Sequence, residues 1–522
     1  MAVTSARLPD GYYNAALDLL DRNLAEGRHD KLAVIDDKGR YTYGEVTARA
    51  NRFANALEGL GVEREQRVLL CLLDSVDFPA AFLGSIKAGI IPVCVNTLLT
   101  TKDYDYMLED TSAKVLVVSA ALLPTFAPIL EKHRKTLKHI VVSGGDADDY
   151  LAFDALVAEA NDSHEPAPTV ADDMAFWLYS SGSTGRPKAA VHLQSHLMRT
   201  ADAFAKPILG IDETDIVFSA AKLFFAYGLG NNLTFPFSVG ATAVLMAERP
   251  TPQACFKRML DHEATIFYGV PTLLGLMLAS PDMPTAGDLN LRLCTSAGEA
   301  LPADLYRRWK DATGVEVLDG IGSTEMLHVF ITNRPGDVRP GSSGTPVEGY
   351  EARLIGDDGT GVGPGEIGEL QINGPTSCVM YWRQREKSRD TFHGPWTRTG
   401  DKYTVSEDGT YTYCGRADDM MKVSGQYVSP FEVEAALITH DAVLEAAVVG
   451  QQDDEHLIKP KAFIVLAEGA SPDGLEATLK DHVKSQIAPY KYPRWFEFVD
   501  SLPKTATGKI QRFKLRAEAN NA

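Results

Sequence analysis

Short apolar runs alternate with helical patterns through the first part of this chain of 522 residues. The strand-like runs are Arg67–Leu73, Val93–Asn96, Val115–Val118, His139–Val142, Ile216–Ser219 and Ala241–Met246. Amphipathic stretches such as Thr42–Leu60 and Pro302–Thr313 separate several of them. This alternation is typical of mostly parallel sheets with helices on their faces, so it predicts an α/β fold.

The pattern of the sequence changes at about Gly341, after which the chain is rich in glycines, turn residues and short strand-like runs. Within this region Gly363–Gly368 matches G-x-G-x-x-G, but a strand follows it and we expect a hairpin turn there. The end of the chain runs helix (Ser429–Thr439), two strands (Val443–Val449, Lys461–Leu466), helix (Asp473–Ile487) and strand (Trp495–Val499). We therefore expect a large domain at 1–417 and a small α+β domain at 418–522, joined at a polar hinge.

Charge and cysteine usage narrow the function. The net charge of −19 argues against nucleic-acid or anionic-membrane binding, which needs a basic surface. The N-terminus shows no signal-peptide pattern, and Lys87 and Pro92 interrupt the most membrane-like run, Ala80–Leu99. The six cysteines lie far apart without a C-x-x-C pair, which favours reduced thiols in a cytoplasm over disulfides or a zinc site.

The stretch Tyr179–Lys188 is the strongest functional signal. It packs hydroxyls and glycines between an apolar strand-like run and two cations, Arg186 and Lys188. Such a loop offers backbone N–H groups and hydroxyls to a phosphate, although a plain Ser/Gly loop remains the alternative. Pro187 stands where the Walker pattern needs a glycine, so we expect a phosphate loop of another type.

Several weaker motifs follow in order along the chain. Asp319–Glu325 places carboxylates around a Gly/Ser/Thr turn, Trp396–Asp401 ends in an aspartate, and Gly415–Gly425 offers Arg416, Asp418 and Lys422. Near the C-terminus Lys509 lies on a Thr/Gly loop within Pro503–Arg512. Each motif alone has a common structural explanation, such as a turn aspartate, a helix-start glutamate or a solvated lysine.

Taken together and in this order, the motifs resemble the adenylate-forming superfamily of acyl-CoA synthetases, adenylation domains and luciferases. The stretches Phe218–Asn231, Ser296–Leu301, Gly320–His328, Lys422–Pro430 and Ala488–Pro493 look most similar to bacterial benzoate-CoA and hydroxybenzoate-CoA ligases. One departure is Ala189-Ala190, where the superfamily commonly carries a glycine. The resemblance implies mostly parallel sheets, a distorted β-barrel and a small C-terminal domain that moves on a hinge.

The resemblance also implies a reaction and a role for each motif. A carboxylate attacks the α-phosphate of Mg·ATP to give an acyl adenylate and pyrophosphate, and the CoA thiol then displaces AMP. Catalytic roles fall to Lys509, Glu325, Thr184, Lys422 and the hinge residue Asp418, with Glu325 and Thr184 at Mg²⁺. The implied ATP- or AMP-binding residues are Ser180, Ser181, Gly182, Ser183, Thr184, Gly185, Lys188, Ala297, Gly298, Glu299, Ala300, Asp319, Gly320, Ile321, Gly322, Ser323, Thr324, Asp401 and Arg416. Lys422, Ser424 and Gly425 are the implied CoA contacts.

We expect an aromatic acid to bind where small and aromatic residues converge, because a flat ring needs faces and room. The predicted lining is Phe225, Ala226, Tyr227, Gly228, Gly230, Tyr268, Gly269, Ile321 and His328. If a helix carries both Glu325 and His328, the two side chains point in similar directions, and His328 can reach a para hydroxyl. Read without the family, such aromatic stripes are more often core, and a satisfied core histidine is the alternative for His328.

Three other functions share these motifs. An adenylation domain would load a carrier protein instead of CoA, a non-catalytic relative would only bind nucleotide, and a luciferase-type oxidase would need an oxidisable acyl group. The residues also leave open whether benzoate or 4-hydroxybenzoate is preferred and whether the protein is a monomer or a homodimer.

Overall fold

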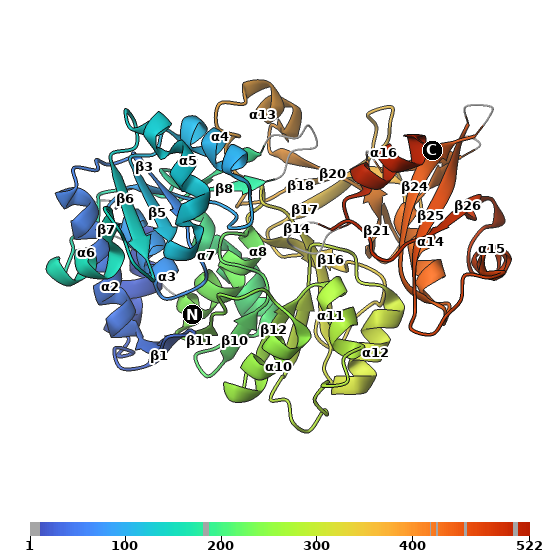
Figure 1. Ribbon diagram of the computed structural model, residues 1–522, viewed down its shortest axis with the longest axis horizontal. Coiled ribbons are helices and arrows are strands. Elements are labelled where there is room, and N and C mark those ends of the chain that lie inside the picture. The colour runs from blue at the N-terminus through green and yellow to red at the C-terminus, as the bar shows by residue number, and fades with distance from the viewer. Residues whose placement is uncertain are drawn as a thin grey trace.

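The computed structural model describes residues 11–180, 187–417, 419–423, 426–453, 457–504 and 510–521. Figure 1 shows a seven-stranded sheet with its helices at one end of the molecule and the C-terminal elements, in orange and red, at the other. A nine-stranded sheet and a smaller antiparallel sheet complete the body. Within the described ranges, no helix combines the length and apolar character needed to cross a membrane.

The seven-stranded sheet is parallel except at one edge, where β8 and β9 pair antiparallel. Its central strands are buried on both faces, as expected when helices cover a parallel sheet. The strand order is β7 (Leu151–Ala152), β6 (His139–Ser143), β5 (Val115–Ser119), β3 (Arg67–Cys71), β4 (Ile91–Cys94), β8 (Met174–Ser180) and β9 (Lys188–Leu193). The accompanying helices are α2 (Tyr43–Gly59), α3 (Asp77–Lys87), α4 (Thr101–Thr111), η3 (Ala120–Leu122), α5 (Leu123–His133) and α6 (Phe153–Glu159).

The nine-stranded sheet has a parallel centre and antiparallel edges. Its order is β16 (Thr345–Pro346), β15 (Val329–Thr332), β14 (Val317–Gly322), β13 (Leu293–Ser296), β12 (Ile266–Gly269), β10 (Ile216–Ser219), β11 (Thr242–Val244), β1 (Leu32–Ile35) and β2 (Arg40–Thr42). The other helical segments of this region are η2 (Leu17–Asp21), α1 (Arg22–Ala25), α7 (His196–Thr200), η4 (Ala201–Leu209), α8 (Ala226–Leu229), η5 (Gly230–Thr234), α9 (Phe235–Val239), α10 (Pro252–Asp261), α11 (Pro271–Leu278) and α12 (Ala303–Thr313).

The glycine-rich region forms a five-stranded antiparallel sheet, a half-barrel. It consists of β17 (Glu351–Ile355), β18 (Gly368–Asn373), β19 (Phe392–His393), β20 (Trp396–Val405) and β21 (Tyr411–Arg416), with α13 (Arg385–Thr391) beside it. The stretch Gly363–Gly368 connects β17 to β18, which pair antiparallel, so the predicted hairpin is confirmed. The α/β fold class with its smaller C-terminal α+β part is confirmed as well.

The C-terminal part has a core of its own, separate from the cores of the sheets before it. It comprises β22 (Met421–Val423), β23 (Gln426–Val428), α14 (Pro430–Ile438), β24 (Val443–Gln452), β25 (Ile458–Leu466), α15 (Leu475–Gln486), η6 (Pro489–Lys491), β26 (Trp495–Phe498) and α16 (Arg512–Asn521). The helix α16 was not predicted from the sequence. All six cysteines are free and buried, which agrees with the predicted reduced thiols.

Candidate functional site

Three segments that are distant in sequence meet at one edge of the seven-stranded sheet. The stretch 378–382 pairs with β9, with Val379 N–H donating to Val191 and Trp382 N–H to Ala189. The adjacent Cys378 N–H donates to the carbonyl of Glu325 at 2.7 Å. These backbone bonds bring the end of β8, the start of β9 and the turn after β14 together.

Glu325 is the best-supported side chain at this junction. Its Oε1 accepts hydrogen bonds from Tyr381 Oη at 2.7 Å and Ser180 Oγ at 3.2 Å, and Lys188 Nζ lies 3.7 Å away. Burial opposes ionisation, but the charge of Lys188 and these hydrogen bonds outweigh it and hold the pKa of Glu325 below its usual range. A partly buried carboxylate whose ionised form is favoured is therefore built into the fold.

Lys188 lies between Glu325 and an aromatic ring. Its Nζ donates to Tyr381 Oη at 3.1 Å and stands 4.3 Å from the centre of the Tyr381 ring. Burial lowers the pKa of Lys188, and the attraction of Glu325 offsets only part of that effect. Burial thus penalises the charge of Lys188, while the hydrogen bonds to Glu325 favour its carboxylate. Tyr381 bonds to both and belongs to no motif, so the sequence did not reveal it.

The sequence-based interpretation of the Glu325–His328 spacing is wrong. These residues lie on the turn between β14 and β15, not on a helix, and Leu327 has a φ of 68°. His192 holds this turn in place, because its Nε2 donates to the carbonyl of Thr324 at 2.8 Å. Ser323 supports it through its Oγ, which accepts from Met326 N–H at 3.2 Å. His192 was another residue that sequence reasoning missed.

His328, which follows β14 in the sequence, lies in an aromatic cluster. Its ring centre is 4.5 Å from Phe235, 5.3 Å from Phe204 and 5.4 Å from Tyr227. Its Nε2 faces Asn231 Oδ1 at 3.1 Å and the Tyr227 carbonyl at 3.3 Å. Both partners are acceptors, so Nε2 carries the proton and Nδ1 is left as an acceptor.

The Nδ1 atom of His328 is buried and has no hydrogen-bond partner in the described part of the chain. Burial lowers the pKa of His328 to about 3, only partly countered by its bond to the Tyr227 carbonyl. The ring is therefore neutral at physiological pH and presents a lone pair inside an apolar cluster. A ligand hydroxyl or amino group can satisfy it.

Neighbouring positions of the predicted acyl pocket are explained partly by packing within the protein. A Cβ at Gly230 would lie 2.4 Å from the His328 ring, and one at Gly228 would lie 2.1 Å from the Lys222 carbonyl. The Tyr227 hydroxyl is bonded to Thr295 Oγ1 at 2.6 Å, and its ring meets Tyr268 edge-on at 6.3 Å. The glycines therefore make room for protein atoms. The remaining predicted lining residues are Phe225, Ala226, Gly269 and Ile321. Of these, Phe225 and Ile321 pack against one hydrophobic core of the large body.

The predicted adenine segment lies beside β13 and β14. Gly298 has a φ of 92°, and the carboxylate of Glu299 accepts from Thr272 Oγ1 at 2.9 Å. Asp319 is buried, and burial raises its pKa well above the usual range. Close backbone contacts explain Gly320 and Gly322, since a Cβ at either would come within 2.7 Å of a carbonyl oxygen. Ala297 and Ala300 complete the segment.

Asp401 and Arg416 face each other across neighbouring strands β20 and β21. Arg416 Nη1 lies 3.0 Å from Asp401 Oδ1 and donates to the Thr399 carbonyl at 3.0 Å. Other predicted residues lie outside the described ranges: Ser181, Gly182, Ser183, Thr184, Gly185, Asp418, Ser424, Gly425 and Lys509. The same applies to the side chain of Lys422.

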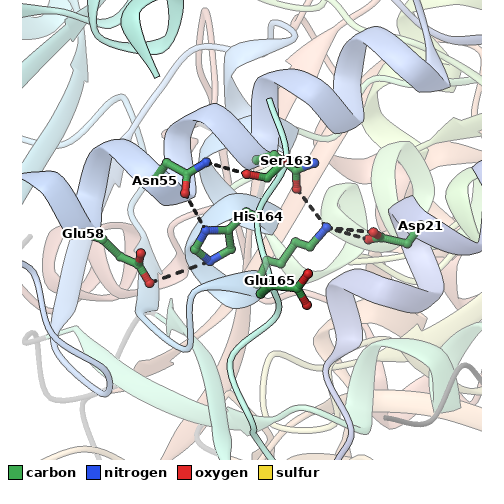
Figure 2. Close-up of a pocket in the computed structure, with 8 residues that line it drawn as sticks. Asp21, Asn55, Glu58, Ser163, His164 and Glu165 are labelled. Carbon is green, nitrogen blue, oxygen red and sulfur yellow. Dashed lines mark hydrogen bonds and ion pairs between the residues drawn. The ribbon is translucent and has the colours of Figure 1, made fainter. Parts of the chain in front are cut away.

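A hollow of about 390 Å³ lies away from these residues, among η2, α2, α3 and the loop 163–165 (Figure 2). Lys87 donates there to Asp21 and Asn51, and His164 Nδ1 lies 2.9 Å from Asn55 Oδ1. None of its lining residues belongs to the predicted motifs, so it is separate from the Glu325 site.

The fold and the site define an enzyme class that comparison with known proteins identifies. Residues 21–382 match the AMP-binding enzyme family, and residues 432–509 match the AMP-binding enzyme C-terminal domain. The chain belongs to the AMP-binding enzyme family.

Individual relatives are similar over nearly the whole chain. A benzoate-CoA ligase of Thauera aromatica is 62% identical, with 97% of this chain and 96% of the relative covered. A 4-hydroxybenzoate-CoA/benzoate-CoA ligase of Rhodopseudomonas palustris is 50% identical, with 97% and 94% covered. The crystal structure of a benzoate CoA ligase from Burkholderia xenovorans LB400 superposes with a TM-score of 0.90 at 52% identity, covering 97% of this chain and 100% of that one.

Proposed function

We propose that this protein is an ATP-dependent aromatic acid-CoA ligase acting on benzoate or a hydroxybenzoate. One oxygen of the substrate carboxylate attacks the α-phosphorus of ATP, and the bond to pyrophosphate breaks. The CoA sulfur then attacks the acyl carbonyl, and AMP leaves. The observation that carries the proposal is Glu325, a carboxylate whose ionised form is favoured by the charge of Lys188 and two hydroxyl donors, on a turn that also bears His328 in an aromatic cluster.

The electrostatics of the first step explain the residues around it. An anion attacks an anion, so positive charge must neutralise the α-phosphate as the new bond forms. We assign that charge to Lys509, the β- and γ-phosphates to Ser181–Thr184, and the ribose hydroxyls to Asp401 with Arg416 nearby. The Asp401–Arg416 pair supports the last assignment, because it fixes the carboxylate on β20 against β21.

The described residues fit a Mg²⁺ ion that arrives with ATP better than a resident metal. No group of three or more His, Cys, Asp or Glu side chains that could hold a metal occurs among them. Mg²⁺ is usually held by one or two carboxylates plus substrate phosphates and water. Glu325 with Thr184 would hold it, and the ion would supply charge neutralisation at the phosphates.

His328 gives the acid pocket a polar end. Its unsatisfied Nδ1 accepts a hydrogen bond from a para hydroxyl, whereas benzoate offers no donor there. The variant His328→Gln should lower kcat/KM for 4-hydroxybenzoate by about tenfold relative to benzoate, the usual effect of one lost hydrogen bond. Equal losses on both acids would assign His328 to the core.

The C-terminal part, which we take as a domain from residue 418 onward, alternates between two orientations in this mechanism. Lys509 would block the incoming thiol if it stayed in place after adenylation. Rotation about Asp418 withdraws it and presents Lys422, Ser424 and Gly425 to CoA. We further propose that the enzyme acts in the cytoplasm as a monomer or homodimer.

One assay tests the reaction class: pyrophosphate and AMP release with a panel of benzoates, with and without CoA. A CoA-dependent aroyl thioester supports the ligase. Acyl adenylate that accumulates even with CoA indicates a carrier-protein enzyme, and no turnover indicates a nucleotide-binding protein. Lys509→Ala should abolish acid-dependent pyrophosphate release but spare thioester formation from supplied benzoyl-AMP. A proline at position 418, Asp418→Pro, should do the reverse.

A further inference from the structure

Helix α16 follows the predicted lysine loop directly and holds the far end of that loop. Ile510 pairs antiparallel with Lys504, and Gln511 N–H donates to the Pro503 carbonyl at 2.8 Å. Lys504 Nζ in turn lies 2.7 Å from Glu445 Oε1 on β24. The described residues that flank the lysine segment, Lys504 and Ile510, are therefore paired with each other, and Lys504 is joined to β24.

Arg512 at the start of α16 anchors the helix to α14. Its Nη2 lies 2.6 Å from Glu434 Oε2 and its Nε 3.2 Å from Oε1, a two-pronged arrangement. Glu434 is buried and also accepts from Val448 N–H on β24 at 2.7 Å. One buried carboxylate thus joins α14, β24 and α16.

Arg516, one helical turn further along, reaches a different partner. It forms an ion pair with Asp419, the residue next to the predicted hinge at 418. Asp419 N–H donates to the Arg416 carbonyl at 3.0 Å, and Arg416 pairs with Asp401. A short path of polar contacts therefore runs from the lysine segment through α16 to the hinge and on to the proposed ribose site.

We propose that Arg516 is a positioning residue: its ion pair with Asp419 holds α16, and with it Ile510 at the end of the lysine segment, against the residue next to the proposed hinge. The inference rests on the proposed role of Lys509 in adenylation. Charge placed on a reacting phosphate acts only when its position is held closely, and misplacement by about 1 Å can cost a hundredfold in rate. Arg512 supplies the buried anchor, and Arg516 sets the angle of the helix against the hinge.

The test separates the two half-reactions. Arg516→Gln should slow pyrophosphate release by about tenfold while thioester formation from supplied benzoyl-AMP stays within about twofold. Arg516→Gln suits this test because the side chain is partly exposed, 31%, whereas removal of Arg512 would leave buried Glu434 without its cation. Lys480→Gln, which breaks the exposed pair with Glu476 on α15, is the matched control and should leave both rates unchanged.

A variant with the charges of Asp419 and Arg516 exchanged, together with amide hydrogen exchange, tests the role of Arg516 separately from the chemistry of Lys509. The double variant D419R with R516D should recover most of the lost adenylation rate. Arg516→Gln should also speed amide exchange at Ile510 and Gln511, and Lys509→Ala should not. Unchanged exchange, or equal slowing of both half-reactions, would overturn the anchoring role. Normal adenylation in Lys509→Ala would instead refute the proposed lysine function, with the exchange data still deciding the anchor.

Discussion

Asp319, which is buried, and Glu325, which is partly buried, are two carboxylates on one short motif, and their pKa values shift in opposite directions. Glu325 receives hydrogen bonds from Tyr381 and Ser180 and faces the ammonium of Lys188. Asp319 Oδ2 receives a long bond from Leu301 N–H at 3.4 Å, and among the described residues no cation lowers its pKa as Lys188 lowers that of Glu325. The supply of donors, not the motif, decides which acid stays ionised.

This difference gives Asp319 and Glu325 different roles. An ionised carboxylate can hold a cation and its phosphates, whereas a carboxyl whose ionisation is disfavoured by burial suits a neutral hydrogen-bonding role in the strand. The carbonyl of Asp319 shows the same structural role, because it accepts from Thr332 and twice from Asn333. The contrast predicts that the two positions respond differently to removal of their charge.

The largest expected effect comes from Glu325→Gln. It removes the charge while it keeps the shape, and we expect adenylation to fall by about a thousandfold, the scale of a lost electrostatic contact to the reacting phosphates. Asp319→Asn mimics the protonated acid and should stay within about threefold of the wild type. The measurement is pyrophosphate release with benzoate and ATP, and comparable losses in both variants would break the comparison.

The next largest expected effect is the contribution of Asp319 to the pH dependence of the unfolding free energy. Because the folded-state pKa of Asp319 is raised, its favourable contribution is complete below the unfolded pKa of about 3.9 and is lost as pH rises toward the folded pKa. The amide introduced by Asp319→Asn cannot titrate, so this variant should gain on the wild type as pH rises above the unfolded pKa. The difference in unfolding free energy should therefore be larger at pH 7 than at pH 5. Urea denaturation at both pH values measures it, and parallel stability curves would contradict it.

The sequence predicted the elements whose signals are local. Buried runs such as Val115–Val118 form the expected strands because a parallel sheet needs apolar residues on both faces. The donors around Glu325 were harder to predict from the sequence, because Tyr381 comes from a segment 56 residues away that carries no motif. The three-residue spacing of Glu325 and His328 fits a helix, but the chain between β14 and β15 closes in a turn instead. Long-range placement of this kind leaves no periodic signal in one sequence.

Tyr381→Phe sharpens the comparison by taking one donor from Glu325. A charge-assisted hydrogen bond contributes about 1.5–3 kcal/mol, so we expect adenylation to need about tenfold more Mg²⁺ for half-maximal rate. Tyr43→Phe is the matched control, because it removes the buried hydroxyl that donates to the Ala241 carbonyl at 2.6 Å, away from this junction. Its Mg²⁺ dependence should match that of the wild type.

Ser180→Ala should have the smallest effect. Its Oγ lies 3.2 Å from Glu325 Oε1, against 2.7 Å for Tyr381 Oη, and a longer bond from a neutral hydroxyl contributes about 1 kcal/mol. We therefore expect about a fivefold rise in the Mg²⁺ requirement, measured in the same titration. Ser180 also adjoins the predicted phosphate loop, so the order of the two effects is informative. If Ser180→Ala is more damaging than Tyr381→Phe, the serine acts on the nucleotide itself, and the ionisation of Glu325 depends chiefly on Tyr381 and Lys188.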